Sequence, residues 1–372
     1  MFEDSIDPNA IVPKLSNFTK RTITKGNTLL FLDEIQLCPQ ALASLKYFCE
    51  VAPEYHVIAA GSLLGVAVNR DEYSFPVGKV NMMTLYPMDI EEFLLAQGEE
   101  QQIARIKECF EENAPMDRYY HKYLLDAYRQ YLAVGGLPEC VAKYVETKNF
   151  ELVRSTQSEI LASYLNDMSK YNSKNEIKKT RLVYNSITTQ LSKKNTRFQY
   201  KLLKSGGRAA EFENAIEWLA LSGIVSRTYN LDTVKKPLDN YKNIDSFKIY
   251  VSDIGLLCAQ KNIIAEDILF SSADLNDFKG GMTENYVLNQ LTAGGHTCYS
   301  WQSDGIAEID FVIQRGRELV PIEVKSAGNN QAKSLAVYMQ KFKPEYAIKA
   351  SSSNFGFENR IKTIPLYAAF CI

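Results

Sequence analysis

Residues 308–325 read EIDFVIQRGRELVPIEVK, and this stretch decides the fold of the C-terminal part of the chain. Apolar and polar residues alternate on either side of Gly316-Arg317, which is typical of two strands joined by a two-residue turn with positive φ at glycine. Such a hairpin places Asp310 directly opposite Glu323. We expect the apolar residues to share one buried face: Ile309, Phe311, Ile313, Val320, Ile322 and Val324.

The other face of this hairpin is charged. Two acids directly opposite each other are unfavourable, so this pairing favours a bound cation or a catalytic role. Glu308 falls opposite Lys325 and is expected to neutralise it. A surface hairpin with a solvated charged face shows the same alternation, so the hairpin alone leaves both interpretations open.

Composition excludes several classes of protein. The 372 residues are 46% hydrophobic and 23% charged, and the net charge of −2 gives no overall attraction to nucleic acid or membrane. The sequence has no apolar run of membrane-helix length and no signal peptide, and its seven cysteines are scattered singly. These features predict a cytoplasmic protein with two or three domains and no membrane association.

The first hundred residues alternate between two patterns. Short apolar runs that predict strands are separated by helical spacing of apolar residues over 39–50 and 89–97. The predicted strands are 28–32, 57–60 and 80–85. This order predicts an α/β class with a parallel sheet that helices cover on both faces.

Two acids, Asp33 and Glu34, end the first of these strands, where α/β folds bind ligands. In a P-loop ATPase the first acid helps to hold Mg²⁺ and the second polarises the attacking water. Ser62 follows the next strand and could sense the γ-phosphate. However, no G-x-x-x-x-G-K-[ST] motif occurs in these 372 residues, so little is present to hold a triphosphate. We expect a truncated ATPase core in which ATP binding is lost.

The segment 170–208 is strongly basic, with eleven Lys or Arg residues and one acid, Glu176. Helical patterns here precede two strand-like runs, 224–229 and 246–251, which is the order of a winged helix. The basic side chains could neutralise phosphates, although a solvated helix face would explain them equally. The candidate nucleic-acid ligands are Lys193, Lys194, Arg197, Lys201, Lys204 and Arg208.

A second constellation comes from the hairpin and the helix predicted over 283–291. Asp310 and Glu323 are the candidate Mg²⁺ ligands. Lys325 would position a water molecule or stabilise developing charge, and Glu284 would complete the outer shell. This combination suits metal-dependent attack on a phosphodiester.

Further stretches extend the pattern over nearly the whole chain. They are LFLDEIQ (30–36), AGSLLG (60–65), LYPMDIEEFL (85–94), GGLPE (135–139), YVSDIGLL (250–257), TENYV (283–287), EIDFVI (308–313) and IEVKS (322–326). Together they make the chain resemble bacterial and archaeal AAA-type P-loop ATPases that carry a C-terminal domain of unknown function, DUF4143.

The resemblance implies four parts. They are a partial AAA-type ATPase core without its P-loop (1–100), a helical lid or linker (101–168), a winged-helix-like part (169–255) and a restriction-endonuclease-like α/β domain of the PD-(D/E)xK type (256–372). Asp33 and Glu34 would be the Walker B acids, with Asp33 on the metal, and Ser62 the sensor. Lys79 stands where the family commonly has an arginine, and lysine lacks the bidentate fork of an arginine finger.

The resemblance also implies a function. The chain is expected to be an ATP-binding AAA-type protein with a nuclease-like domain, associated with DNA or RNA, assembled as a homo-oligomer and using Mg²⁺ and ATP. The alternative is a non-catalytic interaction or scaffold protein that keeps the nuclease fold. Two carboxylates, Asp310 and Glu323, converging on one point beside open space would favour metal chemistry. A Lys325 locked in a salt bridge with Glu308 or Glu323, with no cleft, would favour binding or scaffolding.

Overall fold

The computed structural model describes residues 2, 4–61, 76–170, 174–193, 197–270, 272–303, 307–326 and 333–372. Contacts divide the chain into two compact units, Met1–Leu85 with Glu217–Ile224 and Tyr86–Ile216 with Val225–Ile372. Within the described ranges, none of the helices combines the length and the apolar character needed to cross a lipid bilayer.

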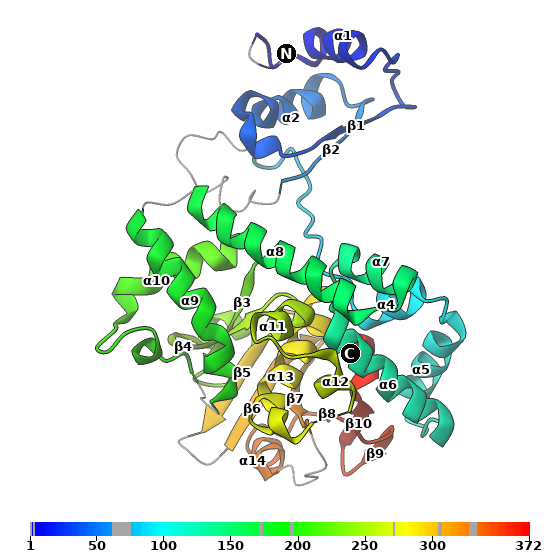
Figure 1. Cartoon of the computed structure of the whole chain (residues 1–372), viewed down its shortest axis with the longest axis vertical. Helices are drawn as coiled ribbons and strands as arrows, with labels where there is room; N and C mark the ends of the chain where they lie inside the picture. The colour runs from blue at the N-terminus through cyan, green and yellow to red at the C-terminus, as the bar shows by residue number, and fades with distance from the viewer. Residues whose placement is uncertain are drawn as a thin grey trace. The chain divides into compact units, whose positions relative to one another are not determined.

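The first unit contains a strand–helix–strand motif (Figure 1). Its elements are α1 (Pro8–Thr19), β1 (Leu29–Leu32), α2 (Pro39–Val51) and β2 (His56–Ala59). The two strands are parallel, since Leu30 pairs with Val57 and Leu32 with Ala59. Helix α2 connects them. The predicted first two strands and the helix between them are therefore confirmed.

The prediction of a sheet covered on both faces is wrong for the described part of this unit. Leu30 is buried with Ile11 and Phe48 on one face. On the other face, Leu29 and Phe31 remain 55% and 58% exposed. Residues 80–85, predicted as the third strand, are irregular and largely exposed. They pair with no strand that the structure describes.

From residue 86 onward the chain alternates helices with the strands of one large sheet. The helices are α4 (Ile90–Ala96), α5 (Glu100–Glu112), α6 (Arg118–Val134), α7 (Pro138–Thr147), α8 (Phe150–Lys170), α9 (Lys174–Ser192), α10 (Ala209–Leu221), α11 (Ile254–Gln260), α12 (Ala265–Leu269), α13 (Asn276–Ala293) and α14 (Lys333–Phe342). The strands are β3 (Val225–Leu231), β4 (Lys242–Val251), β5 (Tyr299–Ser303), β6 (Ala307–Arg315), β7 (Glu318–Val324), β8 (Ala347–Ser351), β9 (Gly356–Glu358) and β10 (Ile361–Pro365).

These strands form a mixed sheet in the order β4-β3-β5-β6-β7-β8-β10-β9. The antiparallel pair β3–β4 was predicted as the wing of a winged helix. It is instead one edge of this sheet, because β3 pairs in parallel with β5 through Tyr229↔Tyr299 and Leu231↔Trp301. The two strands predicted as the wing are present, but they belong to the larger sheet. The winged-helix interpretation of residues 169–255 stays a prediction.

The β6–β7 hairpin has the predicted turn and register. Gly316 has φ +58° and the strands pair from Arg315↔Glu318 to Phe311↔Ile322. The next position of this register sets Asp310 opposite Glu323.

A β-bulge changes the predicted faces of β6. Trp301 pairs with Ile309 but Tyr299 pairs with Val312, so β6 carries one extra residue between these positions. Ile309 and Val312 therefore point to the same side, where they pack in one cluster with residues of α14. All six predicted apolar residues are buried, but the prediction that they share one face is wrong.

Helices cover both faces of this sheet. Glu308 and Ile309 are neighbours in β6, so their side chains point to opposite faces. Ile309 packs with α14, while Glu308 and Glu284 of α13 share the ion-pair partner Lys248. The helix predicted from Thr283 begins earlier, at Asn276, so Glu284 lies in the middle of α13.

Candidate functional site

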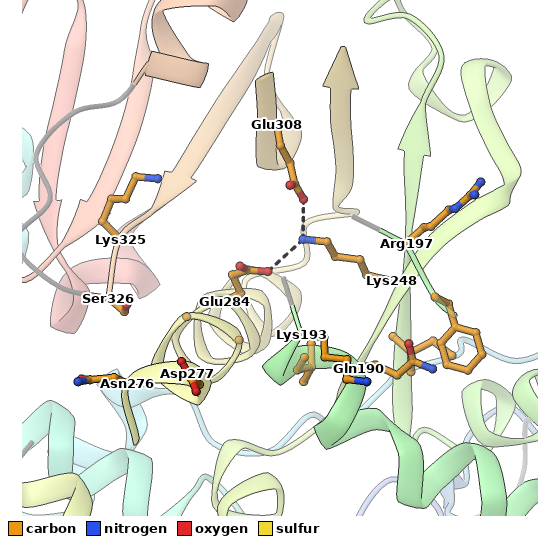
Figure 2. A pocket seen from close by; sticks show the side chains of 15 residues that line it. Gln190, Lys193, Arg197, Lys248, Asn276, Asp277, Glu284, Glu308, Lys325 and Ser326 are labelled. Atoms are coloured by element: carbon orange, nitrogen blue, oxygen red, sulfur yellow. Dashed lines mark hydrogen bonds and ion pairs between the residues drawn. The ribbon is translucent and has the colours of Figure 1, made fainter. Parts of the chain in front are cut away.

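A pocket of about 370 Å³ lies between the end of α9, the first turns of α13 and the strands β4, β6 and β7 (Figure 2). Its charged lining residues are Lys193, Arg197, Lys248, Lys325, Asp277, Glu284 and Glu308. The close approach of α9 and α13 depends on Gly281, where an added Cβ would lie 2.5 Å from the Leu191 carbonyl oxygen.

Lys248 of β4 lies at the centre of this charge cluster. Its Nζ is 3.2 Å from Glu284 Oε2 and 2.8 Å from Glu308 Oε1. Figure 2 shows the ammonium group between the two carboxylates. Tyr250, two residues further along β4, donates its hydroxyl to Glu284 Oε2 at 3.1 Å. Glu308 therefore neutralises Lys248, and the prediction that it neutralises Lys325 is wrong.

The two candidate metal ligands are buried next to this cluster. Asp310 is 9% exposed and Glu323 is 3% exposed, which excludes the solvated charged face. The Val324 N–H donates to Asp310 Oδ2 at 2.7 Å, and Lys325 forms an ion pair with Glu323 Oε1. The second oxygen of Glu323, Oε2, is buried without a hydrogen-bond partner among the described groups.

Burial and neighbouring charges set the protonation of these groups. Burial, followed by Glu284 and Glu323, raises the pKa of the Asp310 carboxyl well above its usual range. Burial also raises the pKa of Glu323, against the opposing effect of Lys325. Burial alone would lower the pKa of Lys248, but the surrounding acids outweigh it, so the pKa is raised and the ammonium stays charged at neutral pH.

The Mg²⁺ site at Asp310 and Glu323 stays a prediction. Among the residues that the structure describes, no three His, Cys, Asp or Glu side chains are placed to hold a metal. The ammonium of Lys248 lies between Glu284 and Glu308, and Lys325 engages Glu323. An open pocket with Lys325 in an ion pair thus combines one feature of each predicted alternative.

Part of the basic segment borders the same pocket. The Gln190 side chain accepts the Gln199 N–H at 2.9 Å and donates to the Gln199 carbonyl at 3.0 Å. The Phe198 N–H donates to the Phe247 carbonyl at 2.7 Å. These bonds hold the segment beside β4 and bring Lys193 and Arg197 to the pocket.

The remaining basic candidates lie elsewhere. Lys201, Lys204 and Arg208, which the structure describes, are exposed and outside the pocket lining, and Lys204 forms an ion pair with Glu211 at 3.0 Å. Lys194 lies outside the described residues.

The predicted ATPase residues lie in the first unit. Asp33 and Glu34 are exposed at the carboxyl end of β1, and the Glu34 N–H donates to Asp33 Oδ1 at 3.0 Å. Lys79 forms an ion pair with Glu50 at 2.9 Å. Ser62 lies outside the described residues.

Sequence reasoning missed Lys248, Tyr250 and Asn285. The available signal was a lysine inside an otherwise apolar strand, Phe247 to Val251. Asn285 accepts the Val251 N–H and donates to the Val251 carbonyl, both at 2.8 Å, so it fixes the end of β4 against α13. The role of this asparagine depends on a contact between residues 34 positions apart, which the sequence does not reveal.

The Gly135-Gly136 motif has a structural role. The buried carboxylate of Asp253 caps α11 by accepting the Leu256 N–H at 2.8 Å, and it accepts the Gly136 N–H at 2.7 Å. A Cβ at Gly135 would lie 2.4 Å from Asp253 Oδ1. The GGLPE and YVSDIGLL stretches therefore join α6, α7 and α11.

Comparison with protein families divides the chain into three matched ranges. Residues 2–94 match an AAA domain, residues 125–267 a domain of unknown function (DUF8612), and residues 279–369 a domain of unknown function (DUF4143). Comparison with curated proteins and with solved structures gave no match. The pocket takes Lys193, Arg197 and Lys248 from the second range and Glu284, Glu308 and Lys325 from the third. The chain therefore carries an AAA domain within residues 2–94, which suggests an ATP-dependent activity, and a DUF4143 domain within residues 279–369.

Proposed function

We propose that this pocket binds the phosphodiester backbone of nucleic acid, and that the DUF4143 domain is a nuclease-like fold that binds without cutting. One observation carries the proposal: Lys193 and Arg197 line the same pocket as Glu284, Glu308 and Lys325. Cationic side chains beside a concave site are the electrostatic requirement for phosphate binding. The absence of cutting is proposed because Lys325 pairs with Glu323, one of the two candidate metal ligands, and Lys248 pairs with Glu284 and Glu308 beside them.

Titration of a fluorescent oligonucleotide, followed by anisotropy, tests the proposal. The double variant K193Q/R197Q should weaken binding about tenfold or more at moderate salt. Because two phosphate contacts are lost, it should also reduce the slope of log K against log salt by about 1.4–1.8. R118Q/K122Q removes the same two charges from exposed positions of α6 and should bind like the wild type. Equal affinity for all three proteins would refute the proposal.

Metal-dependent cleavage is a second candidate function. It is favoured by the buried carboxylates of Asp310 and Glu323 and by the unpartnered Oε2 of Glu323. Incubation of labelled DNA or RNA with protein and Mg²⁺ or Mn²⁺ distinguishes the two functions. We expect the nucleic acid to stay intact. Cleavage that E323Q abolishes would favour the second candidate.

A further inference from the structure

The ammonium of Lys248 lies between two carboxylates of the pocket. It contacts one oxygen each of Glu284 and Glu308, and its side chain is only 10% exposed. The side chains of Glu284 and Glu308 are 22% and 34% exposed and line the pocket. Both carboxylates are therefore open to an incoming anion and would repel it.

Several hydrogen bonds fix β4, the strand that carries Lys248, to α13. Asn285 makes two hydrogen bonds to the Val251 backbone, and Asn289 donates to the same carbonyl at 3.0 Å. Tyr250 ties β4 to Glu284 itself. Lys248 therefore lies on a strand that these bonds hold to α13, next to Glu284, whose charge it neutralises.

A phosphodiester that enters this pocket meets charges of both signs. The described lining contains four basic side chains and three acidic ones. Without Lys248 the two central carboxylates would face the phosphate uncompensated, and a divalent cation is the usual solution to that repulsion. With Lys248 present, the chain itself supplies a positive charge that neutralises these carboxylates.

We infer that Lys248 is a built-in cation that makes binding of a phosphodiester at this pocket independent of divalent metal ions. This inference rests on the proposed function. It assigns Lys248 as a positioning residue, because it acts on the phosphate by neutralising Glu284 and Glu308.

Anisotropy titrations of the full chain in EDTA and in Mn²⁺ test the inference on the wild type. We expect dissociation constants that agree within about twofold. Binding that requires Mn²⁺ would overturn the inference and leave the proposed function standing. No binding under either condition would overturn the proposed function and the inference with it.

Variants add a readout that a purely structural lysine would not give. K248M should lose at least about tenfold in affinity in EDTA and recover it in Mn²⁺, because the metal replaces the missing charge. The triple variant K248M/E284Q/E308Q removes the two acids as well as the lysine, so it should bind equally well in EDTA and in Mn²⁺. It replaces K248M as the test variant if K248M folds poorly. K248M binding like the wild type in EDTA, or a triple variant that requires Mn²⁺, would each overturn the inference.

Discussion

Individual residues show how the chain manages a cluster of buried acids. Asp310 is nearly buried and its carboxylate oxygen accepts only one backbone N–H within the described contacts, from Val324. Glu284 and Glu308 receive the ammonium of Lys248, whereas Glu323 receives that of Lys325. No lysine neutralises Asp310 among the described contacts, and burial with the neighbouring acids raises the pKa of its carboxyl. Keeping this carboxyl ionised in the folded state therefore lowers the free energy of unfolding.

Replacement of Asp310 by asparagine tests this cost. A raised pKa means that the folded state holds a proton that the unfolded chain has released, so wild-type stability falls as pH rises above about 4. D310N removes this penalty and can still accept the Val324 N–H. Urea unfolding should show D310N more stable than the wild type by about 1 kcal/mol or more at pH 8, with a smaller difference at pH 5. A difference that stays constant between these pH values would contradict the raised pKa.

At the scale of helices and strands, tight contacts between distant motifs hold the second unit together. Gly135 has φ +78° and ψ −172°, a conformation essentially confined to glycine, and it touches the Asp253 cap of α11. Gly98 has nearly the same φ, +79°, but an added Cβ there would meet nothing within 4 Å. Gly98 therefore gives the cost of a positive φ alone, whereas Gly135 adds its glycine-only ψ and the contact with Asp253.

We expect G98A to lower the free energy of unfolding by about 1–2 kcal/mol, the cost of a left-handed residue. G135A should cost at least about twice as much, because Asp253 must also move and then loses its bonds to Gly136 and Leu256. Urea unfolding of the two variants checks this. Equal losses would show that the contact with Asp253 contributes nothing.

Sequence patterns predicted the local elements of this fold well and its long-range contacts poorly. Glycine at 316 and the alternation around it were sufficient for the turn and register of β6–β7. The bulge between Ile309 and Val312 arises from pairing with β5, and the edge position of β3–β4 arises from parallel pairing with β5, so neither leaves a local signal. Residues 80–85 have a strand-like composition but no described strand to pair with, and composition alone does not make a strand.

The candidate site was predicted in part for the same reason. Asp310, Glu323, Lys325 and Glu284 were found because their motifs are short and local. Their central partner, Lys248, comes from a strand about 60 residues earlier in the sequence than β6 and was placed in a different predicted domain. Lys248 reaches these acids only through the order of strands in the sheet.

At the scale of the whole molecule, the chain joins an AAA domain to a DUF4143 domain. The AAA domain suggests nucleotide binding, yet these 372 residues contain no G-x-x-x-x-G-K-[ST] motif. Because backbone amides and a lysine of that loop normally hold the triphosphate, we expect this polypeptide to show no saturable ATP binding in calorimetry with Mg²⁺. A dissociation constant in the micromolar range would contradict this expectation and would place phosphate ligands elsewhere in residues 2–94.

The central claim is that an ammonium group replaces a metal ion between Glu284 and Glu308. Anomalous diffraction from crystals soaked in Mn²⁺ tests it most directly. The claim predicts no anomalous peak between these two carboxylates, with Lys248 Nζ in contact with both. A Mn²⁺ peak at that position, with Lys248 displaced from the acids, would contradict it.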